Sequence, residues 1–169
     1  ANMKLEEFKG KSVVVTGAGA GMGKAITQGF LENGATVIGV DIKEEALSAF
    51  KEELKKSDVE TAERFIPLTG DISKEATNEA MIQKALDVTG KIDILVNNAG
   101  VAGHSEPVTE TTNEDWDRIL RVNLDGPMYA IRAAVRQMLR QENGGSIVTI
   151  ASVAGIKGCR SCAAYSAAK

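Results

Sequence analysis

Two residues at the end of the sequence, Tyr165 and Lys169, have a spacing that could support acid/base chemistry. Residues four apart lie on the same face of a helix, so the phenol and the ammonium group would be neighbours. A nearby positive charge favours the charged phenolate and would help the tyrosine to exchange a proton at neutral pH. We therefore expect Tyr165 to act as a general acid or base, the alternative being a half-buried helix tyrosine followed by a solvated lysine.

A glycine-rich segment, residues 16–23 (TGAGAGMG), directly follows an apolar run that predicts a strand and precedes a pattern that predicts a helix. Glycines permit a tight turn and a close approach of the backbone to a pyrophosphate, while the start of the helix offers free N–H groups to an anion. The alternative is a tight turn without a ligand. The surrounding strand, helix and downstream acid favour a nucleotide site, whose residues here would be Gly17, Gly19, Gly21, Met22 and Gly23.

The downstream acid is Asp41, which ends the second predicted strand. A carboxylate at this place can accept hydrogen bonds from both ribose hydroxyls of a dinucleotide and would repel a 2′-phosphate. It therefore favours NAD over NADP, although the nearby Lys43 would soften the repulsion.

The elements that must position these residues follow a repeating order. Short runs rich in β-branched residues predict strands, and because these runs are apolar throughout they are typical of a parallel sheet covered on both faces. Residues 65–68 are a weaker candidate, since Pro67 cannot donate to a central ladder. The alternation with helical patterns predicts a three-layer, Rossmann-like, doubly wound α/β domain. The stronger strand candidates are residues 13–15, 37–40, 94–96 and 147–150.

Several residues predict where the helices begin, end or bend. Gly34 and Gly90 stand where two helices should stop. Thr112 followed by Asp115 resembles a capping box that would open a long helix, and Pro127 should kink that helix. Helical spacing relates Met22 to Ile26 and Phe30, Leu47 to Phe50 and Leu54, Met81 to Ala85 and Val88, and Ile119 to Val122.

Taken in order, the motifs resemble those of the short-chain dehydrogenase/reductase family over nearly the whole chain. The resemblance is specific because six separate motifs occur in the family's order. They are the TGxxxGxG pattern at residues 16–23, the acidic pair Asp71-Ile72, the motif Asn97-Asn98-Ala99-Gly100, Asn123, Ser152, and the YxxxK pair Tyr165 and Lys169.

The resemblance implies a role for each matching residue. Tyr165 would transfer a proton, Lys169 would support it and bind the nicotinamide ribose, and Ser152 would hold the reacting oxygen. Asn123 would position a water for a proton relay. The cofactor, NAD rather than NADP, would supply the hydride. Its adenine would contact Asp71 and Ile72, and its ribose and ring would contact Asn98, Ala99 and Gly100.

The implied activity is an NAD-dependent oxidoreductase that interconverts a secondary alcohol and a ketone. Sugars, polyols, small hydroxy acids, steroids and 3-oxoacyl thioesters are all candidate substrates, the last disfavoured by Ala20 and Asp41. The alternative is a catalytically silent, nucleotide-sensing protein on the same scaffold. The complete set of Ser152, Tyr165 and Lys169 argues against it, because a sensor does not need an acid/base group.

Members of this family usually continue past the lysine of the YxxxK pair with two more strands. We therefore expect residues 1–169 to be one NAD(P)-binding domain that lacks its C-terminal strands. Residues 147–150 would then form an exposed apolar edge. The resemblance also implies a homodimer or homotetramer of the full-length protein, built on the long helix and the helix that carries Tyr165.

Composition excludes other classes of function. The chain has 20 Lys and Arg against 23 Asp and Glu, which provides no electrostatic footprint for nucleic acid or an anionic membrane. There is no apolar run long enough for a membrane span, and the first twelve residues show no signal peptide. Ala1-Asn2 before Met3 resembles an expression-vector remnant. Two cysteines without an export signal predict a cytoplasmic protein.

Two further features carry weaker expectations. Cys159 and Cys162 have the spacing of a redox or half-zinc motif, but structural zinc needs about four ligands and the chain has one histidine and no other cysteine. The segment also lacks the setting of a redox motif, which opens the first helix of a thioredoxin-like fold. We expect neither a metal site nor a redox role, and interpret the segment as a loop that faces the substrate. His104 lies in the loop after Gly100, where an exposed polar residue is favoured over a substrate contact.

Overall fold

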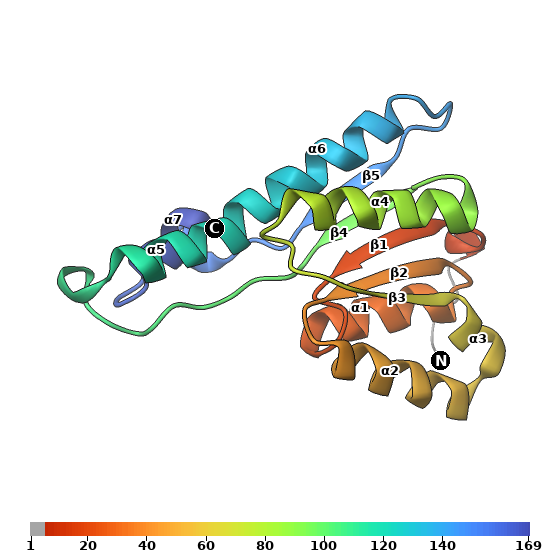
Figure 1. Cartoon of the computed structure of the whole chain (residues 1–169), viewed down its shortest axis with the longest axis horizontal. Helices are drawn as coiled ribbons and strands as arrows, with labels where there is room; N and C mark the ends of the chain where they lie inside the picture. Colours follow the sequence, from red (N-terminus) through yellow and green to blue (C-terminus); the bar gives the residue numbers. More distant parts are fainter. Residues whose placement is uncertain (1–5) are drawn as a thin grey trace.

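The structure is a computed structural model that describes residues 6–169, so the interpretation of Ala1-Asn2 lies outside the described part. Strands and helices alternate along most of the chain (Figure 1). The elements are η1 (Glu6–Phe8), β1 (Ser12–Thr16), α1 (Gly21–Glu32), β2 (Thr36–Asp41), α2 (Glu44–Ser57), α3 (Val59–Glu63), β3 (Phe65–Thr69), α4 (Glu75–Thr89), β4 (Ile94–Asn97), η2 (Val108–Glu110), α5 (Asn113–Leu120), η3 (Arg121–Asp125), α6 (Gly126–Met138), β5 (Ser146–Thr149), η4 (Val153–Gly155) and α7 (Ala163–Ala168).

The five strands form one sheet in the order β3-β2-β1-β4-β5, and all neighbours are parallel. This confirms the predicted doubly wound α/β fold. The weaker candidate is a real strand, because β3 lies at the edge of the sheet and pairs only with β2. Pro67 therefore costs little there, since an edge strand has one side without a ladder partner.

Helices cover both faces of the sheet, as the apolar strands predicted (Figure 1). On one face, α1, α2 and α3 enclose a core with Val13, Phe50 and Phe65 at its centre. On the other, α4 and α6 cover Val14 and Leu95. Two residues with predicted helical spacing lie outside the core, since Met22 is 63% exposed and Val88 is 44% exposed.

At the other edge of the sheet, β5 pairs only with β4. Most of its side chains are exposed, and Val148 retains 49% of its accessible surface. The strand ends at Thr149, one residue before the predicted end, although the N–H of Ile150 still donates to the carbonyl of Asn97 at 2.8 Å. The expected exposed edge is thus present in this structure.

The long helix is built from α5, the π-helical turn η3 and α6, and its α5 end extends beyond the sheet with α7 beside it (Figure 1). The sequence predicted a kink at Pro127, and the structure has a π-helical turn directly before the helix turn that contains this proline. Pro127 has no N–H for the preceding turn and lies at the start of α6, where proline is tolerated. Half of the predicted capping box is present, because the Thr112 hydroxyl accepts from the N–H of Asp115.

The two helix ends predicted at glycines are confirmed. Gly90 ends α4 in the left-handed conformation at φ +76°, and Gly34 follows α1 at φ +84°. Among residues 6–169, no helix combines the length and the hydropathy needed to cross a membrane.

Candidate active site

The glycine turn is held between β1 and the segment after β4 by Thr16 and Asn98. The Thr16 hydroxyl accepts from the backbone N–H groups of Asn98 and Ala99 at 3.1 and 3.0 Å. The amide group of Asn98 donates in return to the carbonyl of Thr16 at 3.0 Å. The side chain of Asn98 therefore faces the turn, and its hydrogen bond helps to fix the backbone conformation of the turn.

The turn is packed so closely that side chains would not fit at two of its glycines. A Cβ on Gly23 would lie 2.0 Å from the carbonyl oxygen of Gly17. Gly17 itself has φ +69°, and a Cβ there would lie 2.9 Å from the Asn98 amide nitrogen. The sequence places glycine here because the start of α1 lies directly against the end of β1.

The first turn of α1 is free to receive an anion. Ala20, the residue before the helix, has no side chain that could cap the first N–H groups, and no acidic residue lies in the first turn. Unsatisfied N–H groups and the positive end of the helix dipole therefore meet at this point. These residues fit the pyrophosphate of a dinucleotide.

Asp41, at the end of β2, faces the same turn. One carboxylate oxygen accepts from the N–H of Gly19 at 2.9 Å, and the other accepts from the N–H of Lys43 at 3.0 Å. A Cβ on Gly19 would approach this carboxylate to 3.0 Å. Asp41 is thus fixed by backbone contacts beside the turn.

A cavity of about 170 Å³, which we call the sheet-edge cavity, opens at the carboxyl ends of the strands. It lies where the strand order changes direction between β1 and β4, the place at which open α/β sheets bind ligands. Gly19, Gly21, Met22 and Gly23 of the adjoining turn do not line it, and neither does Asn98, which follows β4. The expected cofactor residues that line it are Gly17, Asp41, Asp71, Ile72, Ala99 and Gly100.

Asn123 lies in the π-helical turn η3 and is 4% exposed. Its amide nitrogen donates to the carbonyl of Val101 at 2.8 Å, and its amide oxygen accepts from the N–H of Val101 at 3.0 Å. The side chain therefore binds the segment after β4 through both the N–H and the carbonyl of Val101. Each amide group makes one hydrogen bond in this pairing, so one N–H and one lone pair remain for a further partner such as a water.

Tyr165 and Lys169 lie on one side of α7, as their spacing predicted. The ammonium nitrogen of Lys169 is 5.8 Å from the centre of the Tyr165 ring. It also donates to the carbonyl of Ile150 at 3.0 Å, which ties α7 to the end of β5. One of three ammonium protons is used in this bond, and the others remain for a ligand.

Gly100 allows the side chains of Asn123 and Lys169 to approach the same part of the backbone. A Cβ at this position would lie 2.7 Å from the Asn123 amide oxygen and 3.4 Å from the Lys169 ammonium nitrogen. The absence of a side chain allows η3, α7 and the segment after β4 to converge on one point.

A second cavity of about 380 Å³, which we call the tyrosine cavity, is lined by Tyr165 and Ser152. The hydroxyl of Ser152 accepts from the N–H of Ala154 at 3.2 Å, and this bond holds the side chain at the start of η4. Residues 99–101 line the sheet-edge cavity and residues 102–105 line the tyrosine cavity. The two cavities therefore adjoin along one continuous stretch of chain.

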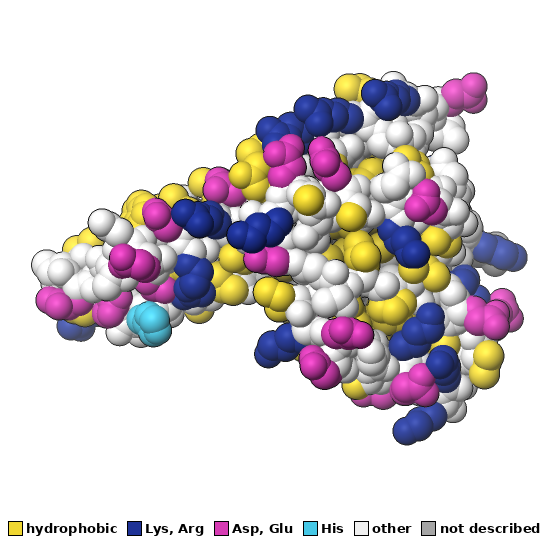
Figure 2. All heavy atoms as spheres, in the orientation of Figure 1, with side chains coloured by type: hydrophobic (Ala, Val, Ile, Leu, Met, Phe, Trp, Pro, Cys, Tyr) yellow, Lys and Arg dark blue, Asp and Glu magenta, His cyan; other side chains and the backbone are white. Residues whose placement is uncertain are grey.

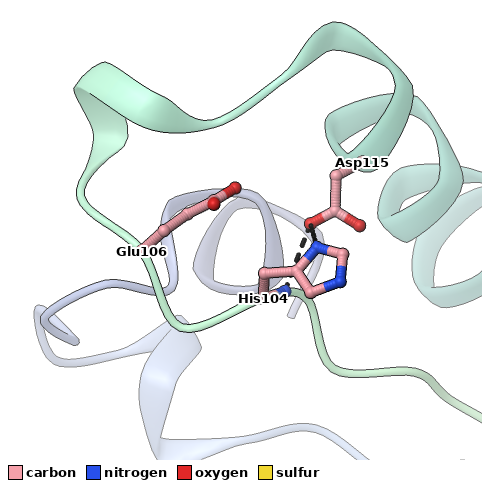
Figure 3. Close-up of side chains that lie close together, drawn as sticks. All are labelled: His104, Glu106 and Asp115. Carbon is pink, nitrogen blue, oxygen red and sulfur yellow. Dashed lines mark hydrogen bonds and ion pairs between the residues drawn. The ribbon is translucent and has the colours of Figure 1, made fainter.

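His104 lines the wall of the tyrosine cavity, and its side chain is 78% exposed. Figure 3 shows it beside Glu106 and Asp115, and the three side chains offer ligand atoms within 4.8 Å of one another. However, Asp115 already pairs with the guanidinium of Arg118 through one oxygen, and its other oxygen accepts from the N–H of His104 at 3.3 Å. This arrangement fits an anchor for the loop better than a metal centre.

The hydrogen bond from Arg118 lowers the pKa of Asp115 below its ordinary value, and the backbone N–H of His104 acts in the same direction against the opposing effect of desolvation. Arg118 also donates to the carbonyl of Ala102 at 3.3 Å. Sequence reasoning assigned Asp115 only to the helix cap. Its role in the cavity wall depends on partners that the capping pattern does not reveal.

Cys159 and Cys162 form a disulfide. The sequence favoured a substrate-facing loop over a redox role, and the segment does line the tyrosine cavity. The disulfide was not expected, since a reducing environment was inferred from the low cysteine count.

Comparison with known proteins agrees with this architecture. A family model described as short chain dehydrogenase matches residues 11–169. The chain is 38% identical over 160 residues to a 3beta-hydroxysteroid dehydrogenase 2 of Eggerthella lenta, covering 95% of this chain and 60% of that protein.

Solved structures are similar too. NAD+-bound xylitol dehydrogenase superposes with a TM-score of 0.86 at 32% identity, covering 96% of this chain and 61% of the other. A short chain dehydrogenase/reductase from Burkholderia phymatum in complex with NAD gives 0.89 at 33% identity, covering 96% and 56%. The chain thus spans about 60% of the length of the curated relatives it matches. With its fold, motifs and family match in agreement, the chain belongs to the short chain dehydrogenase family.

Proposed function

We propose that the protein is an NAD-dependent oxidoreductase that interconverts a secondary alcohol and a ketone. The observation that carries this proposal is the adjacency of the two cavities. Tyr165 and Ser152 share one cavity, and the glycine turn with Asp41 borders the other. A dinucleotide in the sheet-edge cavity would present its reactive ring toward the cavity that holds the acid/base group.

We assign a separate role in the proposed reaction to each of these residues. Ser152 would donate a hydrogen bond to the reacting oxygen, and the Tyr165 hydroxyl would give a proton to it or take one from it. The Lys169 ammonium beside the ring would stabilise the phenolate form. The bound cofactor would supply or accept the hydride. Asn123 would act by holding Val101, and so keep residues 99–105 in place between the two cavities.

The preference for NAD rests on Asp41. Its carboxylate borders the sheet-edge cavity with both oxygens fixed by backbone N–H groups. In this position it would accept hydrogen bonds from ribose hydroxyls and oppose a 2′-phosphate. NAD-bound relatives support binding of NAD as such, and the preference over NADP rests on Asp41 alone.

The test is a screen of secondary alcohols and ketones with NAD⁺/NADH and NADP⁺/NADPH on the full-length protein, followed by absorbance at 340 nm. For an active substrate, Tyr165→Phe should reduce kcat by at least about a hundredfold, the low end of general acid/base contributions. NADH binding, measured by fluorescence titration, should stay within about threefold (~0.6 kcal/mol) of the parent. Near-normal turnover by this variant would rule out the acid/base role.

A matched control is Tyr129→Phe, which removes a hydroxyl from α6 outside both cavities. Its kcat should equal that of the parent. If the protein binds NADH and converts nothing in a broad panel, the proposal is wrong and the nucleotide-sensing alternative takes its place.

We also propose that the full-length protein is a homodimer or homotetramer that uses the long helix. Hydrophobic side chains gather along this helix (Figure 2), and Trp116, Leu124 and Met128 are 37%, 47% and 42% exposed. Large apolar side chains exposed on one surface helix are typical of a protein interface. Light scattering should give an assembly larger than the monomer, and Leu124→Glu should dissociate it. A monomer at micromolar concentration would contradict this.

A further inference from the structure

The loop between Ser152 and Tyr165 contains the disulfide of Cys159 and Cys162. The two α-carbons are 5.7 Å apart, a separation that disulfides ordinarily bridge. The loop forms one wall of the tyrosine cavity. It also borders a neighbouring cavity of about 360 Å³ that is lined by Pro107 and Val108. The disulfide thus lies within the wall that separates the two spaces.

The two cysteines differ in how firmly the rest of the protein holds them. Cys162 directly precedes α7, and its carbonyl accepts from the N–H of Ser166 at 2.8 Å. Cys159 lies at the exposed end of the loop and makes only a weak contact with the neighbouring carbonyl of Arg160. The disulfide is therefore what fastens the outer end of the loop to the start of the helix that carries Tyr165.

The conformation of the loop supports this view. Ser161 has φ +60°, the one positive value at a non-glycine position among residues 6–169. A side-chain-bearing residue in this region is strained and persists when its surroundings enforce it. The flanking disulfide supplies such a constraint.

We propose that Cys159 and Cys162 form a redox modification site that sets the shape of the tyrosine cavity. In the oxidised form the disulfide holds the wall against α7. In the reduced form the two thiols separate, Ser161 is released and the wall becomes mobile. The glycine turn and the sheet-edge cavity are built from other segments and do not change.

The reaction is thiol–disulfide exchange. A dithiol reductant attacks the exposed sulfur of Cys159 as a thiolate, and the sulfur of Cys162 leaves as a thiolate that takes up a proton. The second thiol of the reductant then displaces Cys159 and closes the reductant's own disulfide. Two electrons pass to the protein, which ends with two thiols. Glutathione disulfide reverses the process and is itself reduced to two molecules of glutathione.

The first experiment needs no enzyme activity. The full-length protein is equilibrated with dithiothreitol or with glutathione disulfide, and its thiols and intact mass are measured. Oxidation should remove two thiols and about 2 Da, the mass of two hydrogens. Hydrogen exchange of residues 153–162 should be at least about tenfold faster in the reduced form, while residues 13–23 exchange equally in both.

The second experiment rests on the proposed function. Reduction should raise the KM for the alcohol substrate by about fivefold or more (~1 kcal/mol) and leave the affinity for NADH unchanged. The double variant Cys159→Ser, Cys162→Ser should behave as the reduced protein and ignore both reagents. Ser105→Ala, which changes another wall position, should remain sensitive to the redox reagents.

Two free thiols after exposure to glutathione disulfide would overturn the inference. A disulfide that forms but leaves both the exchange of residues 153–162 and the KM unchanged would overturn it as well. If no substrate is converted, the proposed function fails, and the exchange experiment still decides whether the wall responds to redox state.

Discussion

Replacing Asn123 by alanine should destabilise the protein strongly, because the change leaves two backbone groups of Val101 without partners. The amide of Asn123 pairs with the Val101 carbonyl at 2.8 Å and with its N–H at 3.0 Å. Leaving a buried polar group unpaired costs about 1–3 kcal/mol. Two such groups give roughly 2–6 kcal/mol, and the lower half of this range applies because Val101 is only partly buried.

The free energy of unfolding can be measured by urea titration with far-UV circular dichroism. Fluorescence of Trp116, the one tryptophan of the chain, reports separately on α5. The two curves should coincide if unfolding is two-state. Asn143→Ala is the matched control, since Asn143 is exposed, and it should change the free energy by less than about 0.5 kcal/mol.

A second variant tests the direction of the hydrogen bonds. Asn123→Asp keeps an acceptor for the N–H of Val101, but places a carboxylate beside the Val101 carbonyl. Protonation restores a donor, so the folded state should raise the pKa of this introduced carboxyl. Its stability deficit relative to the parent should therefore shrink as the pH falls through that raised value.

The reasoning would be refuted if Asn123→Ala were as stable as Asn143→Ala. Unchanged stability together with a large loss of kcat would point instead to the water-positioning role that the family resemblance implies. Loss of stability and of kcat together would support a positioning role through residues 99–105.

Three further predictions follow from the same geometry. Asp41→Ala should shift the ratio of kcat/KM for NAD over NADP toward NADP by at least about tenfold (~1.4 kcal/mol), measured with both cofactors; an unchanged ratio would place the selectivity elsewhere. Gly23→Ala should weaken NADH binding by at least about tenfold in a fluorescence titration, because its Cβ would lie 2.0 Å from a carbonyl oxygen. In the control Gly29→Ala, in the same helix, the Cβ meets nothing within 4 Å, so this variant should stabilise the protein by up to about 1 kcal/mol. Equal effects of the two variants on NADH binding and on stability would contradict the packing argument. Arg118 lowers the pKa of Asp115, so this carboxylate contributes stability that is fully present above its ordinary pKa of about 3.9 and is lost as the pH falls through the lowered value. The difference in free energy of unfolding between the parent and Asp115→Asn, measured in urea, should therefore shrink on acidification. A difference that does not depend on pH would exclude this linkage.

Much of the scaffold can be predicted from the sequence because its signals are local. Runs of β-branched residues predicted the four stronger strands, and their lack of polar alternation predicted a sheet covered on both faces. The proline in residues 65–68 made this run a weaker strand candidate, and the structure resolves the question by placing β3 at the edge of the sheet. The glycine turn was recognisable because glycine is required wherever a helix start lies directly against a strand end.

The candidate site depends on contacts between segments that are distant in sequence. Asn123 and Val101 are 22 residues apart, and Lys169 and Ile150 are 19 apart, so no helical or strand period relates them. Their meeting depends on the π-helical turn and on the path of the loop after β4. Asp115 shows the same limit, since its capping pattern was visible and its pairing with Arg118 and His104 was not.

The sequence by itself determined the family, the fold class and the positions of the candidate catalytic side chains along the chain. The tertiary structure decided which backbone groups those side chains hold, that the loop with the two cysteines is closed by a disulfide, and that two cavities adjoin at residues 99–105. The physical reason is that periodicity and turn chemistry act over a few residues. The wall of a cavity is set by packing between elements that only the folded chain brings together.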